Sequence, residues 1–244
     1  MTNKYMYFVA NWKMFGDLRS LKSLKKVINF VNRIKQKKFK LVYCPPSTLI
    51  YPLVKKFKKS SIEVGAQNCH ENEYYGAFTG QLNSTMLKGV GAKYVILGHS
   101  EIRNLGETDD MINKKIKSAI KSGLKIIFCI GETIIEKRKK VTKKILLKQI
   151  KKDLNKINNK KKILIAYEPV WAIGSGLIPK DTELFETINF IKSRVKGAKV
   201  LYGGSVNSKN INNLKNIDNI DGFLIGGASQ NSNNLIDIIK KTYN

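Results

Sequence analysis

Eight short, β-rich apolar runs recur along the chain, and amphipathic stretches rich in lysine separate most of them. Apolar residues recur at helical spacing in these stretches, which predicts helices. Strands that alternate with helices predict a parallel sheet with right-handed crossovers. The runs cover residues 5–10, 39–44, 62–66, 93–97, 124–129, 163–167, 199–202 and 222–225. The clearest predicted helices cover residues 20–34, 145–157, 185–195 and 234–241, with a short one near 84–87.

The length of the chain favours one form of parallel sheet. A chain of 244 residues with eight βα units has the size of a closed (β/α)₈ barrel. We therefore predict an α/β fold in which eight parallel strands are ringed by helices, as a single domain over residues 1–244. An open, doubly wound sheet is the alternative that the pattern leaves open.

The net charge of +27 is the most unusual property of the composition. It comes almost entirely from lysine spread over the predicted helices, where lysine usually faces solvent. Proteins that bind nucleic acids concentrate charge on one face and interleave aromatic residues. We therefore expect no specific nucleic-acid partner, and a nucleic-acid-binding or structural role stays the alternative to catalysis.

Cysteine usage and apolar run lengths limit the cellular setting. Cys44, Cys69 and Cys129 are far apart and show no metal-ligand spacing, which favours reduced thiols in a cytoplasmic protein. No run approaches the ~20 apolar residues of a membrane span, and the start of the chain shows no secretory signal. We expect no membrane partner.

Residues 163–176, ILIAYEPVWAIGSG, contain the most informative carboxylate. Glu168 stands where a predicted strand ends, and Pro169 stops the strand from continuing. An apolar loop follows and closes in Gly174-Ser175-Gly176. A carboxylate beside a glycine-hinged apolar loop is typical of a base under a lid, where apolar surroundings raise its pKa. An ordinary surface acid before a turn is the alternative.

Further polar groups follow other predicted strands, and a barrel would bring them to one rim. Lys13 follows the first strand and is either a surface lysine or a group that stabilises an anion. His99 follows the fourth strand, at the start of a short predicted helix. There it is either structural or a neutral hydrogen-bond donor. His70 has no such setting, and we interpret it as structural.

Two glycine pairs follow the seventh and eighth strands. Gly203-Gly204-Ser205 and Gly226-Gly227 each precede a predicted helix N-terminus, where backbone N–H groups can bind phosphate. Phosphate sites in barrels commonly form after these two strands. The glycines could also be plain turn residues, and the same rim would suit other enzymes that act on phosphorylated sugars.

Seven motifs along the whole chain, in a fixed order, resemble those of the triosephosphate isomerase family. They are Asn11-Trp12-Lys13-Met14, Gly65-Ala66-Gln67-Asn68, Gly98-His99-Ser100-Glu101, Cys129-Ile130-Gly131-Glu132, Ala166-Tyr167-Glu168-Pro169-Val170-Trp171-Ala172-Ile173-Gly174, Tyr202-Gly203-Gly204-Ser205-Val206 and Gly226-Gly227-Ala228.

The resemblance implies interconversion of dihydroxyacetone phosphate and glyceraldehyde 3-phosphate, in glycolysis and gluconeogenesis, with no metal or organic cofactor. It makes Glu168 the base and neutral His99 the electrophile. It makes Lys13 the group that stabilises negative charge, with Glu101 as its partner during the cycle. For substrate binding it implies Asn11 and Lys13, with phosphate on the N–H groups of Gly174, Ser205, Gly226 and Gly227. Residues 170–176 become the lid, with Ile173 against the carboxylate and Tyr202 and Ser205 as its latch.

The resemblance also implies a homodimer in which the loop Gln67–Leu82 inserts into the partner and braces the site there. Two family positions differ in this chain. Where this chain has Ile102 the family has an arginine, and where it has Gln81 the family has a glutamate. In the family, that arginine and that glutamate form an ion pair. Because both members are absent, no charge is left unpaired, but we expect a weaker brace. The lid ends in Leu177-Ile178-Pro179, where many family members have Lys-Thr-Ala. This end is a hinge, so the difference bears on the rate of lid closure and not on the mechanism.

Overall fold

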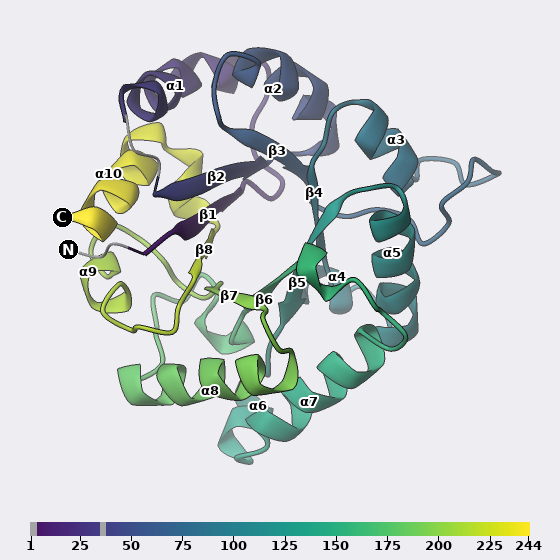
Figure 1. Ribbon diagram of the computed structural model, residues 1–244, viewed down its shortest axis with the longest axis vertical. Coiled ribbons are helices and arrows are strands. Elements are labelled where there is room, and N and C mark those ends of the chain that lie inside the picture. The colour runs from purple at the N-terminus through teal and green to yellow at the C-terminus, as the bar shows by residue number, and fades with distance from the viewer. Residues whose placement is uncertain (1–3, 35–37) are drawn as a thin grey trace.

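The computed structural model describes residues 4–34 and 38–244, and eight parallel strands in this part of the chain close into a barrel. Each strand pairs with the next one in sequence, and β8 pairs with β1. Helices ring the barrel (Figure 1). The predicted (β/α)₈ barrel is therefore confirmed, and the open sheet is wrong.

The strands are apolar on both faces because both are buried. In β1, Phe8 and Ala10 pack toward the helices, whereas Val9 between them belongs to the cluster inside the barrel. Such two-sided burial explains why the strands read as continuous apolar runs. Their bounds lie within one residue of the predicted runs: β1 Met6–Asn11, β2 Phe39–Cys44, β3 Glu63–Ala66, β4 Tyr94–Leu97, β5 Lys125–Ile130, β6 Ile163–Tyr167, β7 Lys199–Tyr202 and β8 Gly222–Ile225.

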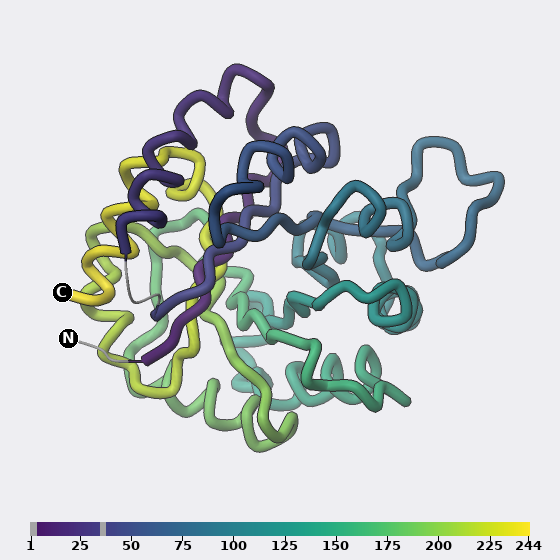
Figure 2. Tube along the Cα trace, turned by 45° about the horizontal axis from the view of Figure 1, so that its top comes forward, coloured from purple at the N-terminus to yellow at the C-terminus, as the bar shows by residue number. Residues whose placement is uncertain are grey.

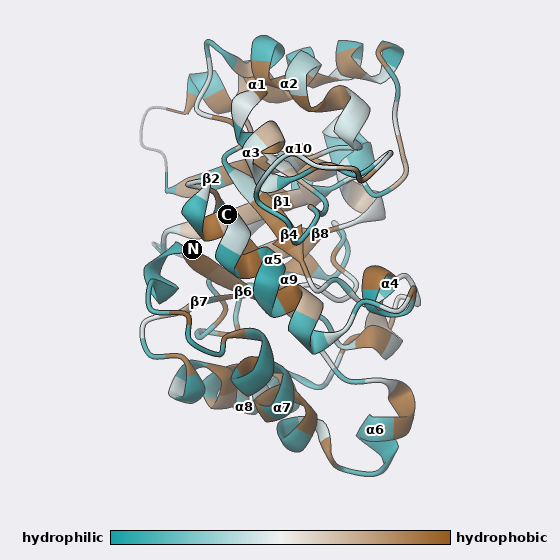
Figure 3. Cartoon of the chain, turned by 90° about the vertical axis from the view of Figure 1, so that its right-hand side faces the viewer, coloured by the Kyte–Doolittle hydropathy of each residue, from teal (hydrophilic) through white to brown (hydrophobic). Residues whose placement is uncertain are grey.

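The longer helices each bury an apolar stripe and present polar residues outward. Figure 3 shows this as brown strands in the centre and helices that carry both brown and teal. In the described residues they are α1 Leu24–Arg33, α2 Ile50–Phe57, α3 Ser84–Gly89, α4 Ser100–Arg103, α5 Asp109–Lys121, α6 Ile134–Arg138, α7 Thr142–Asp153, α8 Asp181–Arg194, α9 Ile211–Leu214 and α10 Ser232–Tyr243.

Helix ends depart from the predicted ranges where tertiary contacts compete with the helix. The first predicted helix begins as a 3₁₀ turn over Arg19–Ser23 before α1. The helix predicted for 145–157 already ends at Asp153, whose carbonyl accepts a hydrogen bond from the Asn113 side chain at 2.8 Å. Ile157 nevertheless stays buried. The apolar stripe therefore predicted burial correctly but not the end of the helix.

Asp221 ties together the strands that close the barrel. Its backbone N–H donates to Val200 C=O, and its C=O accepts from Tyr7 N–H. Its buried carboxylate accepts from Val200 N–H at 2.9 Å and contacts the ammonium groups of Lys192 at 2.6 Å, Lys4 at 3.3 Å and Lys199 at 3.4 Å. One carboxylate therefore links β7 and the start of β8 to α8 and to the residue Lys4 before β1.

The loop between β3 and α3 projects from the barrel. Figures 1 and 2 show it reaching beyond the ring of helices, on the side of the molecule opposite α10. Its side chains include exposed aromatic rings, among them Tyr74 and Tyr75. Nowhere in residues 4–34 and 38–244 is there a helix with the length and apolarity of a membrane span.

We predict that Asp221→Asn lowers the free energy of unfolding by about 2–3 kcal/mol at pH 7. This loss of stability is at or below the lower end of what is usual when one member of a buried ion pair is removed, because the lysines keep part of their hydration. Burial disfavours the charged carboxylate, but the hydrogen bonds from Lys192 and Val200 outweigh it, and the pKa of Asp221 is lowered. The stabilisation is therefore complete above the unfolded pKa of ~3.9 and is lost as the pH falls through the lower folded value.

Urea unfolding of the native chain and the variant at several pH values measures this difference. The matched control is Asp218→Asn, the same change at an exposed site three residues away. The role given to Asp221 is wrong if both variants unfold at the same urea concentration at pH 7.

Candidate active site

A cavity of about 430 Å³ opens at the carboxyl ends of the strands and collects the predicted site residues. Of the nine, eight line this single cavity, and only Glu101 stands outside its lining. They come from the carboxyl ends of β1, β4, β6, β7 and β8 or from the loops that follow these strands, as expected for a barrel. The lining residues that the sequence predicted are Asn11, Lys13, His99, Glu168, Gly174, Ser205, Gly226 and Gly227.

Two glycines make room for Glu168, which follows β6 directly. A Cβ on Gly131 would lie 1.7 Å from the carbonyl oxygen of Glu168, so no side chain fits where the end of β5 passes Glu168. A Cβ on Gly203 would lie 2.7 Å from Glu168 Cγ. The Glu168 N–H donates to Ile130 C=O at 2.8 Å. The neighbouring strand ends therefore hold the carboxylate close on both sides.

The Glu168 carboxylate is almost completely buried, with 2% of the residue exposed. Burial raises its pKa, and the positive or donating groups of His99, Cys129, Ser100 and Lys13 only partly oppose this. Its Oε1 lies 3.3 Å from His99 Nε2, whereas its Oε2 has no hydrogen-bond partner in the described part of the chain. A desolvated carboxylate with one free oxygen is suited to accept a proton.

His99 is oriented by its own helix. It is the N-cap of α4, and its Nδ1 accepts a hydrogen bond from Glu101 N–H at 3.2 Å. In the neutral ring the proton therefore lies on Nε2, the nitrogen that faces Glu168 and lines the cavity. The imidazole is thus set to donate one hydrogen bond into the site.

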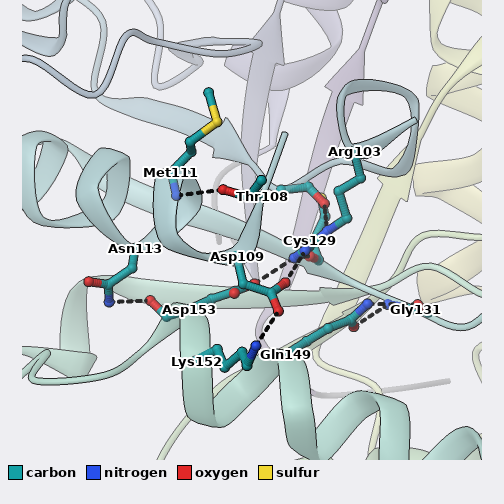
Figure 4. A network of polar contacts seen from close by, with 11 residues as sticks. Arg103, Thr108, Asp109, Met111, Asn113, Cys129, Gly131, Gln149, Lys152 and Asp153 are labelled. Carbon is teal, nitrogen blue, oxygen red and sulfur yellow. Dashed lines mark hydrogen bonds and ion pairs between the residues drawn. The ribbon is translucent and has the colours of Figure 1, made fainter. Parts of the chain in front are cut away.

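Arg103 fixes the backbone behind His99 (Figure 4). Its Nε donates to Gly98 C=O at 2.8 Å and one terminal nitrogen donates to Cys129 C=O at 3.3 Å, which joins the ends of β4 and β5. The guanidinium also pairs with Asp109 at 3.0 Å and with Asp153 at 2.6 Å. Burial raises the pKa of Asp153 to about 7 despite Arg103.

Lys13 lies in an uncommon backbone conformation after β1. Its φ is +55°, in the left-handed region that non-glycine residues rarely adopt. Its Nζ contacts Glu101 Oε1 at 2.5 Å, and Glu101 itself is half exposed. Lys13 and Glu101 are therefore paired in this structure, with the ammonium in the cavity and the acid at its edge.

The predicted lid is tied at one end and open at its tip. The 3₁₀ turn Val170–Ala172 is anchored by Trp171, whose Nε1–H donates to the buried Glu132 at 2.9 Å. Residues 174–177 are exposed, and Gly174 and Gly176 have φ values of +68° and +77°. The Tyr202 hydroxyl is buried with no hydrogen-bond partner among the described residues, so the proposed latch stays a prediction.

The two glycine turns differ from each other. Gly226-Gly227 opens directly into a 3₁₀ turn over Gly227–Gln230, as predicted. The helix predicted after Ser205 is wrong, because α9 begins only at Ile211. Asn207 and Asn210 hydrogen-bond the backbone between them, and such local bonds compete with helix formation. The phosphate subsite therefore has one short helical turn and one irregular loop.

Several site residues were not recognised from the sequence. Glu132 stands in a quoted motif, but its bond to Trp171 depends on the fold. Gln67 and Gln230 donate to backbone carbonyls around Lys13, and Leu224 lines the cavity. Glutamines and leucines carry no local signal for such roles. The described residues contain no cluster of three or more His, Cys, Asp or Glu side chains that could hold a metal ion.

Comparisons with known proteins agree over nearly the whole chain. The sequence model of the family described as "Triosephosphate isomerase" matches residues 6–242. The "Triosephosphate isomerase" of Dictyoglomus thermophilum is 40% identical over 95% of this chain and 97% of its own length. The protein of that name from Thermodesulfovibrio yellowstonii is 40% identical over 96% of this chain and 98% of its own.

A solved structure gives the same result in three dimensions. The crystal structure of triosephosphate isomerase from Bartonella henselae superposes with a TM-score of 0.89 at 32% identity, covering 98% of this chain and 100% of the other. The family model, the relatives and the solved structure thus all give the same family. The chain belongs to the triosephosphate isomerase family.

Proposed function

We propose that the chain interconverts dihydroxyacetone phosphate and glyceraldehyde 3-phosphate. The observation that carries this proposal is the buried Glu168 carboxylate, which faces the Nε2 of His99 at 3.3 Å in the cavity that also contains Lys13 and the glycine turns. Moving a proton between two carbons next to a carbonyl requires a base, a hydrogen-bond donor and a positive charge. Glu168, His99 and Lys13 are the candidates for these three groups, and all of them line the cavity.

In the proposed mechanism, Glu168 removes a proton from the carbon beside the carbonyl and returns it to the neighbouring carbon. The negative charge then rests on the oxygens of an enediolate between the two steps. His99 donates from Nε2 to these oxygens and moves protons among them, while the Lys13 ammonium stabilises their charge. Asn11 orients the carbonyl end. Its Oδ1 accepts from Lys13 N–H at 3.2 Å, and its NH₂ group, which has no hydrogen-bond partner among the described residues, is proposed to serve the substrate.

The phosphate is proposed to bind the backbone N–H groups of Gly174, Ser205, Gly226 and Gly227, all of which line the cavity. Gly174 belongs to the lid, so phosphate binding and lid closure are coupled. Closure brings Ile173 against the carboxylate and excludes water, which further disfavours the charged base. The three free, buried cysteines support a reducing, cytoplasmic setting.

We predict that Glu168→Gln lowers kcat by about 10²–10⁴-fold, the usual contribution of a general base. A coupled assay with both triose phosphates measures this, and the native chain must turn over for the proposal to hold. Because the pKa of Glu168 is raised, the acid limb of kcat/KM should lie above the ordinary glutamate pKa. Equal activity of the native chain and the variant would exclude Glu168 as the base.

The same substitution should make the fold more stable, because it removes a buried charge. A carboxyl with a raised folded pKa contributes stability at low pH and loses it as the pH rises through that value. The gain from Glu168→Gln should therefore be largest at pH 8 and vanish near pH 4. Thermal melting at both pH values tests this, with an expected rise of at least about 2 °C at pH 8.

We also propose that the chain forms a homodimer through the loop Gln67–Leu82. The loop projects from the barrel (Figure 2), and its side chains Tyr74, Tyr75 and Phe78 are 67%, 77% and 44% exposed. Met14, beside Lys13, is fully exposed. A partner's loop would cover these apolar groups and brace the Lys13 turn. Within the loop, the His70 ring packs on Phe78 at 4.4 Å, which fits its interpretation as structural.

Phe78→Asp is predicted to give monomers at micromolar concentration, because a charge replaces an apolar contact at the centre of the proposed interface. Loss of the brace should lower kcat/KM by about 10²-fold through misplacement of Lys13. Analytical ultracentrifugation and the isomerase assay measure both effects. Phe185→Asp, on the exposed surface of α8, is the matched control and should leave both unchanged. A native chain that sediments as a monomer would contradict the dimer.

A further inference from the structure

Three side-chain amides hold the two peptide groups on either side of Lys13. In the peptide group before it, Lys13 N–H donates to Asn11 Oδ1 at 3.2 Å, and Trp12 C=O accepts from Gln230 Nε2 at 3.2 Å. In the peptide group after it, Lys13 C=O accepts from Gln67 Nε2 at 2.8 Å. The relative orientation of these two groups is set by the φ and ψ angles of Lys13, so the amides together hold the backbone at its φ of +55°.

This φ angle decides where the Lys13 ammonium lies. A left-handed backbone is unfavourable for lysine, so the conformation persists only where surrounding contacts enforce it. The side chain then passes Gly226, where an added Cβ would lie 3.5 Å from Lys13 Cε. Its Nζ ends in the cavity opposite Glu101. If the peptide group before Lys13 rotated, the ammonium would swing away from the substrate.

Gln230 connects this turn to the phosphate subsite. It is the last residue of the 3₁₀ turn Gly227–Gln230, which begins with the second glycine pair, and it lines the same cavity. The neighbouring Ser229 C=O also accepts from Trp12 Nε1 at 3.1 Å. The turn that is proposed to bind phosphate and the turn that carries Lys13 are therefore bonded to each other through Gln230 and Ser229.

We propose that Gln230 is a positioning residue that holds the Lys13 ammonium at the enediolate end of the substrate. This inference rests on the proposed function. It assigns to Gln230 no contact with the reacting atoms: the amide acts through the Trp12 carbonyl on the backbone of Lys13. Loss of the amide should therefore weaken stabilisation of negative charge at the carbonyl end more than binding of the phosphate.

The first test is Gln230→Met, which keeps the length of the side chain and removes the donor. We expect kcat/KM to fall about tenfold, as for one lost hydrogen bond in a preorganised site, with most of the loss in kcat. The thermal midpoint should change little, because the residue is only partly buried. If this variant does not fold, Gln230→Asn replaces it, since the shorter amide cannot reach Trp12 C=O. Unchanged kinetics of a folded variant would overturn the proposal.

A double-mutant cycle with Lys13→Ala separates positioning from direct substrate contact. If Gln230 acts through Lys13, adding Gln230→Met to Lys13→Ala should cost less than about twofold further, because coupled residues are not additive. The matched control is Gln149→Met. The Gln149 amide also binds backbone, at both polar atoms of Gly131, but away from Lys13. Its effect should be the same in both backgrounds. If Gln230→Met still lowers kcat/KM tenfold in the Lys13→Ala background, Gln230 contacts the substrate itself, and the proposal is wrong.

Binding measurements keep the test independent of turnover. Calorimetry with 2-phosphoglycolate, which carries a carboxylate where the substrate has its enediolate end, should show affinity weakened about tenfold by Gln230→Met. Inorganic phosphate, which needs only the glycine turns, should bind the variant and the native chain alike. Equal weakening of both ligands would mean that Gln230 shapes the phosphate subsite, contrary to the proposal. The native chain could show no isomerase activity while Gln230→Met still selectively weakens binding of 2-phosphoglycolate. That result would reject the proposed function but retain the positioning role of Gln230.

Discussion

The site depends on one desolvated carboxylate. Glu168 is buried because glycines at 131 and 203 let neighbouring strand ends approach it more closely than any side chain would allow. This approach removes water from the carboxylate and raises its pKa. Two of the groups that partly offset the loss of hydration, His99 and Lys13, also line the cavity. The geometry that makes Glu168 basic and the geometry that surrounds it with its partners are therefore the same.

The two ends of the barrel use charged groups in opposite ways. At the amino ends of the strands, Asp221 is saturated with partners, and its lowered pKa reflects a stabilising contact. At the carboxyl ends, Glu168 has an oxygen without a partner in the described residues, and Lys13 has an unfavourable φ. Glu168 and Lys13 thus place an unsatisfied oxygen and an unfavourable backbone conformation at the rim, where a substrate can relieve them.

The sequence was sufficient for the fold and for most of the site, for identifiable reasons. Strand bounds followed from apolar runs because every strand is buried on both faces. Glu168 and His99 were recognised because each stands within two residues of the end of a strand. Gln230 and Glu132 could not be recognised from the sequence, because their roles depend on hydrogen bonds to Trp12 C=O and to Trp171 that only the fold creates. Helix ends were missed where side-chain amides, such as Asn113 on Asp153 C=O, compete with the helix.

The charge of +27 has a different origin from the chemistry of the site. The chain has only 18 acidic residues against 45 basic ones, so each buried acid stands out against a lysine-rich surface. Every buried acid in the described part of the chain has a specific cation or donor beside it: Glu107, Glu132, Asp153, Glu168 and Asp221. The fold and the site therefore use a few acids at fixed places, and the excess of lysine lies mainly outside these contacts. Such a surface raises the rate at which a dianionic phosphate meets the protein, by an effect that salt screens, without changing what happens at Glu168.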